Sequence, residues 1–148
     1  MSHDSGPTAF FSKTYDEAYA LLIEARNYVA YEEAGDRAAL GDLSRMNVSL
    51  ETMRLTTRVT EIMAWLLYQK AVFAGEMSLD EALSEDCRLD RNEVCLGGAQ
   101  PEALPRRLAD LMSRSQKLYL RVMRLDDMMV RDTRPPRVTD LWPGDEQS

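Results

Sequence analysis

Two arginines in the middle of the chain are the residues with the clearest potential for binding chemistry. Arg54 and Arg58 lie four positions apart in a stretch without Gly or Pro, so on a helix they project from the same side. Glu51 and Glu61 lie three positions beyond either end of this pair. The pattern fits a solvated ladder of ion pairs. It also fits a small site that holds a partner's carboxylate or the end of a facing helix, with Trp65 as an apolar or cation-π anchor. Most surface ion pairs contribute little energy, which favours the ladder.

The binding interpretation nevertheless defines a set of candidate residues on one helix. The candidates for partner binding or a dimer interface are Glu51, Arg54, Arg58, Glu61, Trp65 and Gln69. On this interpretation the double substitution Arg54→Ala with Arg58→Ala leaves folding nearly unchanged and weakens association.

The sequence contains few groups for catalysis or metal binding. His3 is the only histidine, and it lies in a predicted leader. Cys87 and Cys95 are separated by residues that include no histidine and no second cysteine pair, so they do not complete a tetrahedral metal site. We therefore predict no catalytic residue, no metal, no cofactor and no enzymatic activity. The alternative is a small mutase-like helical enzyme, which would require Arg54 and Arg58 to line an enclosed pocket.

Composition indicates protein partners. The 148 residues suffice for one domain, and 25 acidic against 18 basic residues give a net charge of -7. This charge opposes broad binding to nucleic acid or to an anionic membrane. No apolar run is long enough to span a bilayer, and the first residues do not resemble a signal peptide. We expect a cytoplasmic protein without membrane insertion.

Three long helices are predicted from apolar periodicity and end signals. The first begins at Thr14, with Glu17 completing a capping box, and ends at Gly35. The second begins between Asp36 and Asp42 and ends at Ala74, before Gly75. The core-facing stripe of the first helix is predicted to be Tyr15, Ala18, Leu22, Ala25 and Val29.

The third long helix is predicted from about Glu102 to Val130. A heptad pattern marks its core face, with one polar interruption at Ser115. The pattern consists of Leu104, Leu108, Leu111, Ser115, Leu118, Val122, Leu125 and Met129. Between the second and third helices, Ser78 and Glu81 form a capping box that predicts a short extra helix.

These elements predict an all-α fold, an antiparallel up-down-up three-helix bundle with a long central helix. Residues 1–13 form a flexible leader, 14–130 a single domain and 131–148 a flexible tail that contains Trp142. The second helix has apolar residues on too many sides for one bundle interface. We take this excess as evidence of a second interface, most simply a symmetric dimer.

Two stretches resemble the RcdA family of alphaproteobacteria. The first is ETMRLTTRVTEIMAWLLYQKAVFAGEMS, residues 51–78, with its RLTTR core, Trp-Leu-Leu and Gly-Glu-Met. The second is LPRRLADLMSRSQKLYLRVMRLD, residues 104–126. With the first helix, the resemblance covers most of residues 15–129.

The resemblance implies a dimeric three-helix bundle that acts as an adaptor. It implies as partners the ClpXP protease system, other adaptor proteins and protein cargo, such as a cell-cycle response regulator destined for destruction. Recruitment to a cell pole would follow from these partners. Many relatives have no known function, so a dimeric structural protein without a role in proteolysis is the alternative.

Overall fold

The computed structural model describes residues 7–98 and 100–133, and all regular structure in these ranges is helical. The long helices are α1 (Pro7–Tyr31), α3 (Asp42–Phe73) and α6 (Arg106–Thr133). The short ones are α2 (Glu33–Ala38), α4 (Leu79–Ala82) and α5 (Glu93–Leu96), with single 3-10 turns η1 (Glu85–Cys87) and η2 (Pro101–Ala103). The predicted all-α class is confirmed. No helix in the described ranges is long and apolar enough to cross a membrane.

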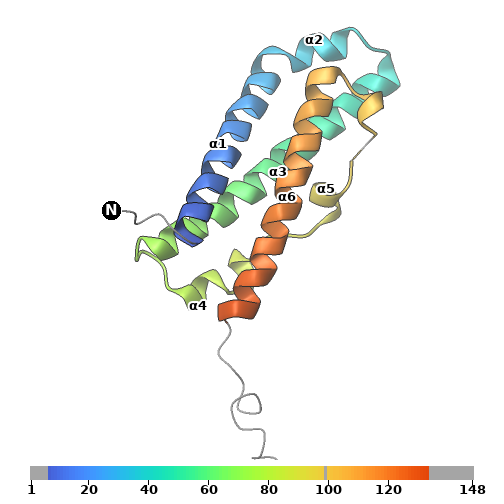
Figure 1. The fold of residues 1–148 in the computed structure, drawn as a ribbon. Helices are drawn as coiled ribbons and strands as arrows, with labels where there is room; N and C mark the ends of the chain where they lie inside the picture. Colours follow the sequence, from blue (N-terminus) through green and yellow to red (C-terminus); the bar gives the residue numbers. More distant parts are fainter. Residues whose placement is uncertain (1–6, 99, 134–148) are drawn as a thin grey trace, which may run out of the picture.

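Ion pairs show that α1 and α6 run in opposite directions. Arg121 donates to Glu17 at 2.8 Å, and Arg114 donates to Glu24 at 2.8 Å. Arg107 also contacts Glu24, at 3.2 Å. Because these arginines are spaced by seven, they lie on one side of α6 and meet the glutamates in reverse order. In Figure 1 α1 accordingly ascends while α6 descends.

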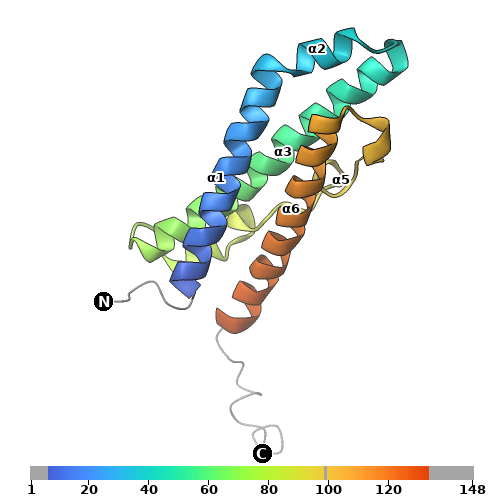
Figure 2. The same cartoon turned by 45° about the horizontal axis from the view of Figure 1, so that its top comes forward.

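The predicted up-down-up order is wrong in the direction of α6. Arg58 and Trp65 of α3 bond to Ser115 and Asp126 of α6, in the same order along both helices. The two helices therefore run parallel. Parallel neighbours require a connection that travels back along them, and residues 74–105, the return segment, supply it. Figures 1 and 2 show this segment passing from the lower end of α3 to the upper start of α6.

The core lies among the three long helices. The α6 heptad is confirmed, since Leu104 through Leu125 of the predicted set are buried and Met129 is partly buried. On α1 the buried stripe is Phe11, Thr14, Ala18, Leu21, Ala25 and Tyr28. Tyr15 and Leu22 of the predicted stripe are partly buried against the core, whereas the prediction is wrong at Val29, which is 43% exposed. Tyr28 occupies the core position because its hydroxyl can donate to Asp36, at 2.8 Å.

The predicted start of the first helix is also wrong. Thr14 is a buried residue inside α1 rather than its cap, and the helix begins at Pro7, a residue type suited to a first turn. Residues 7–13 therefore belong to α1 and not to a leader. The remaining predicted leader, residues 1–6, and tail residues 134–148 with Trp142 lie outside the described residues. Residues 131–133 continue α6.

The predicted end of α3 and start of α4 are confirmed. Gly75 has a φ of 75°, its N–H bonds to Val72 O, and the N–H of Glu76 bonds to Ala71 O, which is a Schellman motif. Ser78 and Glu81 form both bonds of the capping box at the start of α4. These local signals end α3 and begin the return segment.

Candidate protein-interaction site

The predicted arginine pair holds the end of a helix, and that helix is α5 of the same chain. Arg54 Nη1 donates to the carbonyl oxygens of Glu93 and Val94, at 2.8 and 2.6 Å. Arg58 donates from Nε to Cys95 O and from Nη2 to Gly97 O, both at 2.8 Å. The last carbonyl groups of a helix have no partner within it, so cationic side chains satisfy them well.

Arg58 is the most deeply placed of the candidates. Only 1% of its surface is exposed, and its Nη1 donates to Ser115 Oγ at 2.9 Å and to Met112 O at 3.1 Å on α6. One guanidinium therefore joins α3, α5 and α6. The bond from Arg58 to Ser115 explains the polar interruption of the α6 heptad, because the serine faces the buried charge. Ser115 Oγ also donates to Met112 O, at 3.0 Å.

The hydrogen bonds of the Arg58 guanidinium go to three carbonyl groups and one hydroxyl, so neutral oxygens satisfy its charge. Burial lowers the pKa of Arg58, and the nearby Arg54 acts in the same direction. Glu51 opposes this shift. The geometry favours a structural cation whose donors are already occupied.

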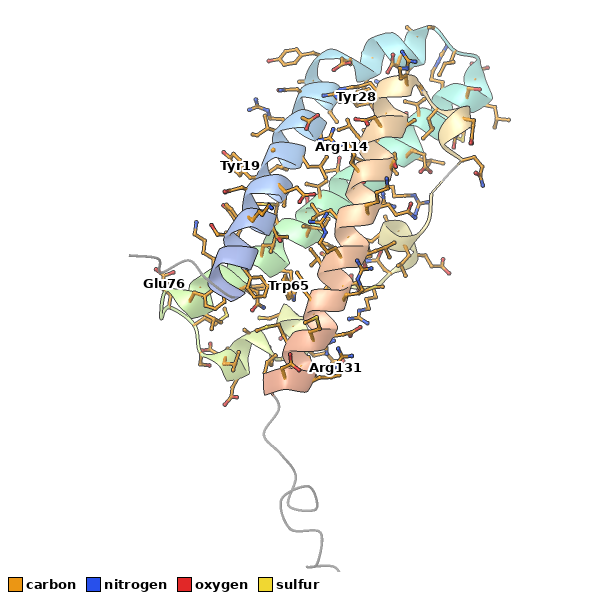
Figure 3. All side chains as sticks on the ribbon, in the orientation of Figure 1. Tyr19, Tyr28, Trp65, Glu76, Arg114 and Arg131 are labelled. Atoms are coloured by element: carbon orange, nitrogen blue, oxygen red, sulfur yellow. The ribbon has the colours of Figure 1, made fainter. Side chains whose placement is uncertain are left out.

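Trp65 belongs to a second internal cluster, around Asp126. The indole Nε1 donates to Asp126 Oδ1 at 2.9 Å, and Trp65 is 2% exposed between the long helices (Figure 3). Arg88 and Arg91 of the return segment also bond to this carboxylate, at 2.9 and 3.0 Å. Arg91 bonds to Asp127 as well. The cluster fixes the first half of the return segment to α6.

The other candidates are also engaged or enclosed. Glu51 is buried and accepts from Arg54 at 3.2 Å, and Glu61 accepts from the backbone N–H of Asp90 at 3.3 Å. Tyr119 bonds to the carbonyl of the same Asp90. Gln69 is 2% exposed, and its Oε1 has no hydrogen-bond partner among the described residues.

Two interpretations of these six residues were a solvated ladder and a partner-binding site. The structure corrects the first and leaves the second as a prediction. A solvated ladder is wrong for Glu51 and Arg58, because both are buried. Their predicted role in partner or dimer contacts stays a prediction. A shallow pocket beside Arg58 is lined by Leu96, Gly97 and Met112, among others, but Arg54 does not line it. No group of three or more His, Cys, Asp or Glu side chains in the described parts could hold a metal ion.

A regular apolar stripe on α3 faces away from the core. Its residues, the outer seam, alternate in steps of three and four along the helix. The outer seam comprises Leu43, Met46, Leu50, Met53, Thr57, Thr60, Ala64, Leu67 and Ala71. Leu43 is 82% exposed and Met53 66% exposed, and Met46, Leu50 and Leu67 are also exposed. The predicted excess of apolar surface on this helix is thus confirmed.

The outer seam has the form of a helix-pairing surface. Steps of three and four keep side chains on one line of a helix, and the buried residues of α3, such as Leu55 and Ile62, lie on the opposite side. Figures 1 and 2 show α1 and α6 on one side of α3 only. Leu43, Met46 and Leu50 also line a shallow hollow with Asn47. Among the described residues, the large side chains of this face are therefore exposed, whereas Thr57, Ala64 and Ala71 are half-buried.

Sequence reasoning missed the residues that bind the return segment. Asp126, Arg88 and Arg91 lie far apart in sequence, and nothing in their local pattern links them to Trp65. Ser115 was the available signal, since a polar residue inside a buried heptad calls for a partner across the core. A second signal was a row of arginines spaced by seven, namely Arg107, Arg114 and Arg121. Such a row shares one side of α6 and could have indicated which acidic residues of α1 it meets.

Comparison with known proteins adds two findings. The chain matches a family described as "Protein of unknown function (DUF1465)" over residues 4–142. No curated protein matches it. Among solved structures it is similar to the crystal structure of RcdA from Caulobacter crescentus CB15, at 33% sequence identity and a TM-score of 0.67. That similarity covers 80% of this chain and 89% of the RcdA chain.

Proposed function

Because this chain belongs to the RcdA family and to DUF1465, we propose that it is a protein-binding adaptor and not an enzyme. In this proposal it acts in the cytoplasm as a homodimer and assists delivery of protein cargo to the ClpXP protease. Other adaptor proteins take part, and the complex is recruited to a cell pole. The cargo is of the kind represented by a cell-cycle response regulator.

The outer seam of α3 is the observation that carries the proposal. A buried Leu or Met side chain contributes roughly 1.5–3 kcal/mol relative to an exposed one, so a row of them gains stability from a partner. Exposed apolar surface organised along a line favours a helix as that partner. The described polar groups that might have formed a catalytic site, such as Arg58 and Asp126, are instead engaged in holding the return segment.

A second copy of the chain is the simplest partner for the outer seam. From Leu43 to Ala71 the seam is about 42 Å long at a rise of about 1.5 Å per residue. Such a length suits a symmetric helix pair, which uses the same surface on both subunits. Arg54, whose side chain is 22% exposed, and the half-buried Glu61 lie beside the seam and remain candidates for its polar edge.

The link to ClpXP rests on family membership. The stretch 51–78 that resembles the RcdA family forms much of α3 and its cap, which includes the seam from Met53 onward. The family description of DUF1465 assigns no function.

The seam is tested by matched methionine substitutions. Met53→Glu places a charge in the outer seam, whereas Met128→Glu places the same charge on an exposed site of α6, at 44% exposure. Light scattering should give a dimer for the wild type and for Met128→Glu, and a monomer for Met53→Glu at the same concentration. Equal masses for all three proteins would contradict a seam dimer.

Delivery is tested with purified ClpXP and the proteins that co-purify with this chain. The adaptor proposal predicts ClpX among those proteins and faster degradation of at least one of them when the wild-type chain is added. Met53→Glu should lose this acceleration and Met128→Glu should keep it. A stable dimer that neither captures ClpX nor accelerates any degradation would instead indicate a purely structural role.

A further inference from the structure

We infer that two copies of this chain pair along α3 in antiparallel register, with Thr57 of each copy at the two-fold axis. This inference rests on the proposed homodimer and specifies its geometry. It follows from the order in which large and small side chains succeed one another along the outer seam.

The outer seam has a bulky half and a small half. Leu43, Met46, Leu50 and Met53 precede Thr57, and these four side chains are all exposed. After Thr57 the seam continues with Thr60, Ala64, Leu67 and Ala71, of which only Leu67 is large. A single helix face therefore changes from large to small residues at its midpoint.

Antiparallel pairing brings the two halves together. With Thr57 at the centre, Leu50 of one copy faces Ala64 of the other, and Met53 faces Thr60. Leu43 similarly faces Ala71. Three of the four bulky side chains of the first half then meet a small one, and only Met46 faces a large residue, Leu67. The separation of the two helices is therefore more even than in a parallel pair.

Parallel pairing gives a poorer fit. It would set Leu50 against Leu50 at one end and Ala64 against Ala64 at the other. The helices would then have to diverge at the bulky end or leave unfilled space at the small end, and both options lose packing contacts. Antiparallel helices also align their macrodipoles favourably.

The polar residues of the small half are compatible with a close helix contact. Thr60 Oγ donates to Thr56 O within its own helix at 2.7 Å, so this hydroxyl needs no partner across the interface. Its methyl group is then available for packing against Met53 of the second copy. Thr57, on the axis, meets its own counterpart, where the two hydroxyls can bond to each other.

Charges beside the seam fit the same register. Arg54 and Glu61 lie on the same flank, next to the return segment, where Arg54 bonds to Glu93 O and Glu61 accepts from Asp90 N. With Thr57 at the centre, Arg54 of one copy lies within one residue of the level of Glu61 in the other. Opposite charges then come together at two places along one edge of the dimer, whereas parallel pairing would put the same flank of the two copies on opposite edges.

Single cysteines in the outer seam distinguish the registers by disulfide formation. The parent is the full chain with Cys87→Ser, because Cys87 is half-buried whereas Cys95 is buried. Thr57→Cys alone should form a disulfide-linked dimer on mild oxidation. Leu50→Cys and Ala64→Cys, co-expressed with different affinity tags, should form a mixed linked dimer, and neither should link when expressed alone. Disulfides require Cα atoms about 4.4–6.8 Å apart, whereas antiparallel copies of position 50 lie about 20 Å apart.

Light scattering of every variant without oxidant separates the two proposals. A dimer in which Leu50→Cys alone links efficiently, or in which no seam position links, would overturn the antiparallel register and leave the homodimer standing. A monomeric parent would overturn both. Linked Thr57→Cys dimers together with the mixed dimer, and no linkage of the parent, would support the register.

Discussion

Replacing Arg58 by methionine should destabilise the fold, because this buried side chain joins α3, α5 and α6. Methionine keeps an unbranched, mostly apolar side chain but donates no hydrogen bond. The Cys95 and Gly97 carbonyl groups then lose the donor that Arg58 supplies. Met112 O keeps the hydroxyl of Ser115 as a donor.

The expected loss is about 1–3 kcal/mol. The bond from Arg58 to the Cys95 carbonyl is buried, and a buried carbonyl left without a partner costs about 1–3 kcal/mol. Gly97 is exposed, so water can replace the bond from Arg58 to its carbonyl. Removing a buried charge returns part of this cost, because burial disfavours the ionised guanidinium, as its lowered pKa indicates. Arg54→Met is the matched control. Arg54 is more exposed, so water can replace its bonds, and we expect a loss of about 1 kcal/mol.

Urea denaturation followed by far-ultraviolet circular dichroism measures both losses. Hydrogen exchange should show faster exchange in residues 93–98 of the Arg58→Met variant, with little change in the amides of α1. The same free energy of unfolding for the wild type and for Arg58→Met, within about 0.5 kcal/mol, would refute the structural role of this cation. The predicted loss of stability, if observed, would decide against the sequence-based expectation that alanine at both arginines leaves folding nearly unchanged.

Three further predictions concern other parts of the fold. Gly75→Ala should cost about 1–2 kcal/mol because its φ of 75° is strained for a residue with a Cβ, although no atom lies within 4 Å of the added carbon. Gly41→Ala, at a φ of -73°, should cost less when both variants are compared by thermal melts, because only the preference for glycine over alanine at a helix N-cap opposes it. Asp126→Asn should cost about 2–3 kcal/mol in urea denaturation and loosen the return segment to limited proteolysis, since two arginines and an indole lose their charged acceptor. Burial raises the pKa of Tyr119 from 10.0 to about 12, so the stability that it contributes is full below pH 10 and is lost as pH rises towards 12. Tyr119→Phe should therefore reduce the loss of stability across this interval, as measured by melts at each pH.

The sequence predicted the helices best where the signal is local. The Schellman glycine at Gly75 and the capping box at Ser78 depend on residues within one turn, and both are confirmed. Thr14 and Glu17 have the same spacing as Ser78 and Glu81, but the capping box predicted from them is wrong. Thr14 is buried by tertiary packing inside a longer α1, and local helix propensity carries no information about that packing.

The direction of α6 was decided only by tertiary structure. Heptad periodicity defines the buried face of a helix and is the same for parallel and antiparallel neighbours. The order of the pairs Arg58–Ser115 and Trp65–Asp126 sets α6 parallel to α3, and those contacts join residues more than fifty positions apart. A return segment of about thirty residues was long enough for either direction.

For the candidate residues too, some features were determined by the sequence and others only by the tertiary structure. The sequence by itself determined that Arg54 and Arg58 share one side of α3, that the helix carries more apolar surface than its core needs, and that Ser115 interrupts a buried heptad. Only the tertiary structure decided that the arginines hold the carbonyl groups of α5 and that the uncovered apolar face is the outer seam. The physical reason is that spacing along a helix fixes which side chains share a direction, whereas the groups that they meet come from segments whose position depends on the packing of the whole chain.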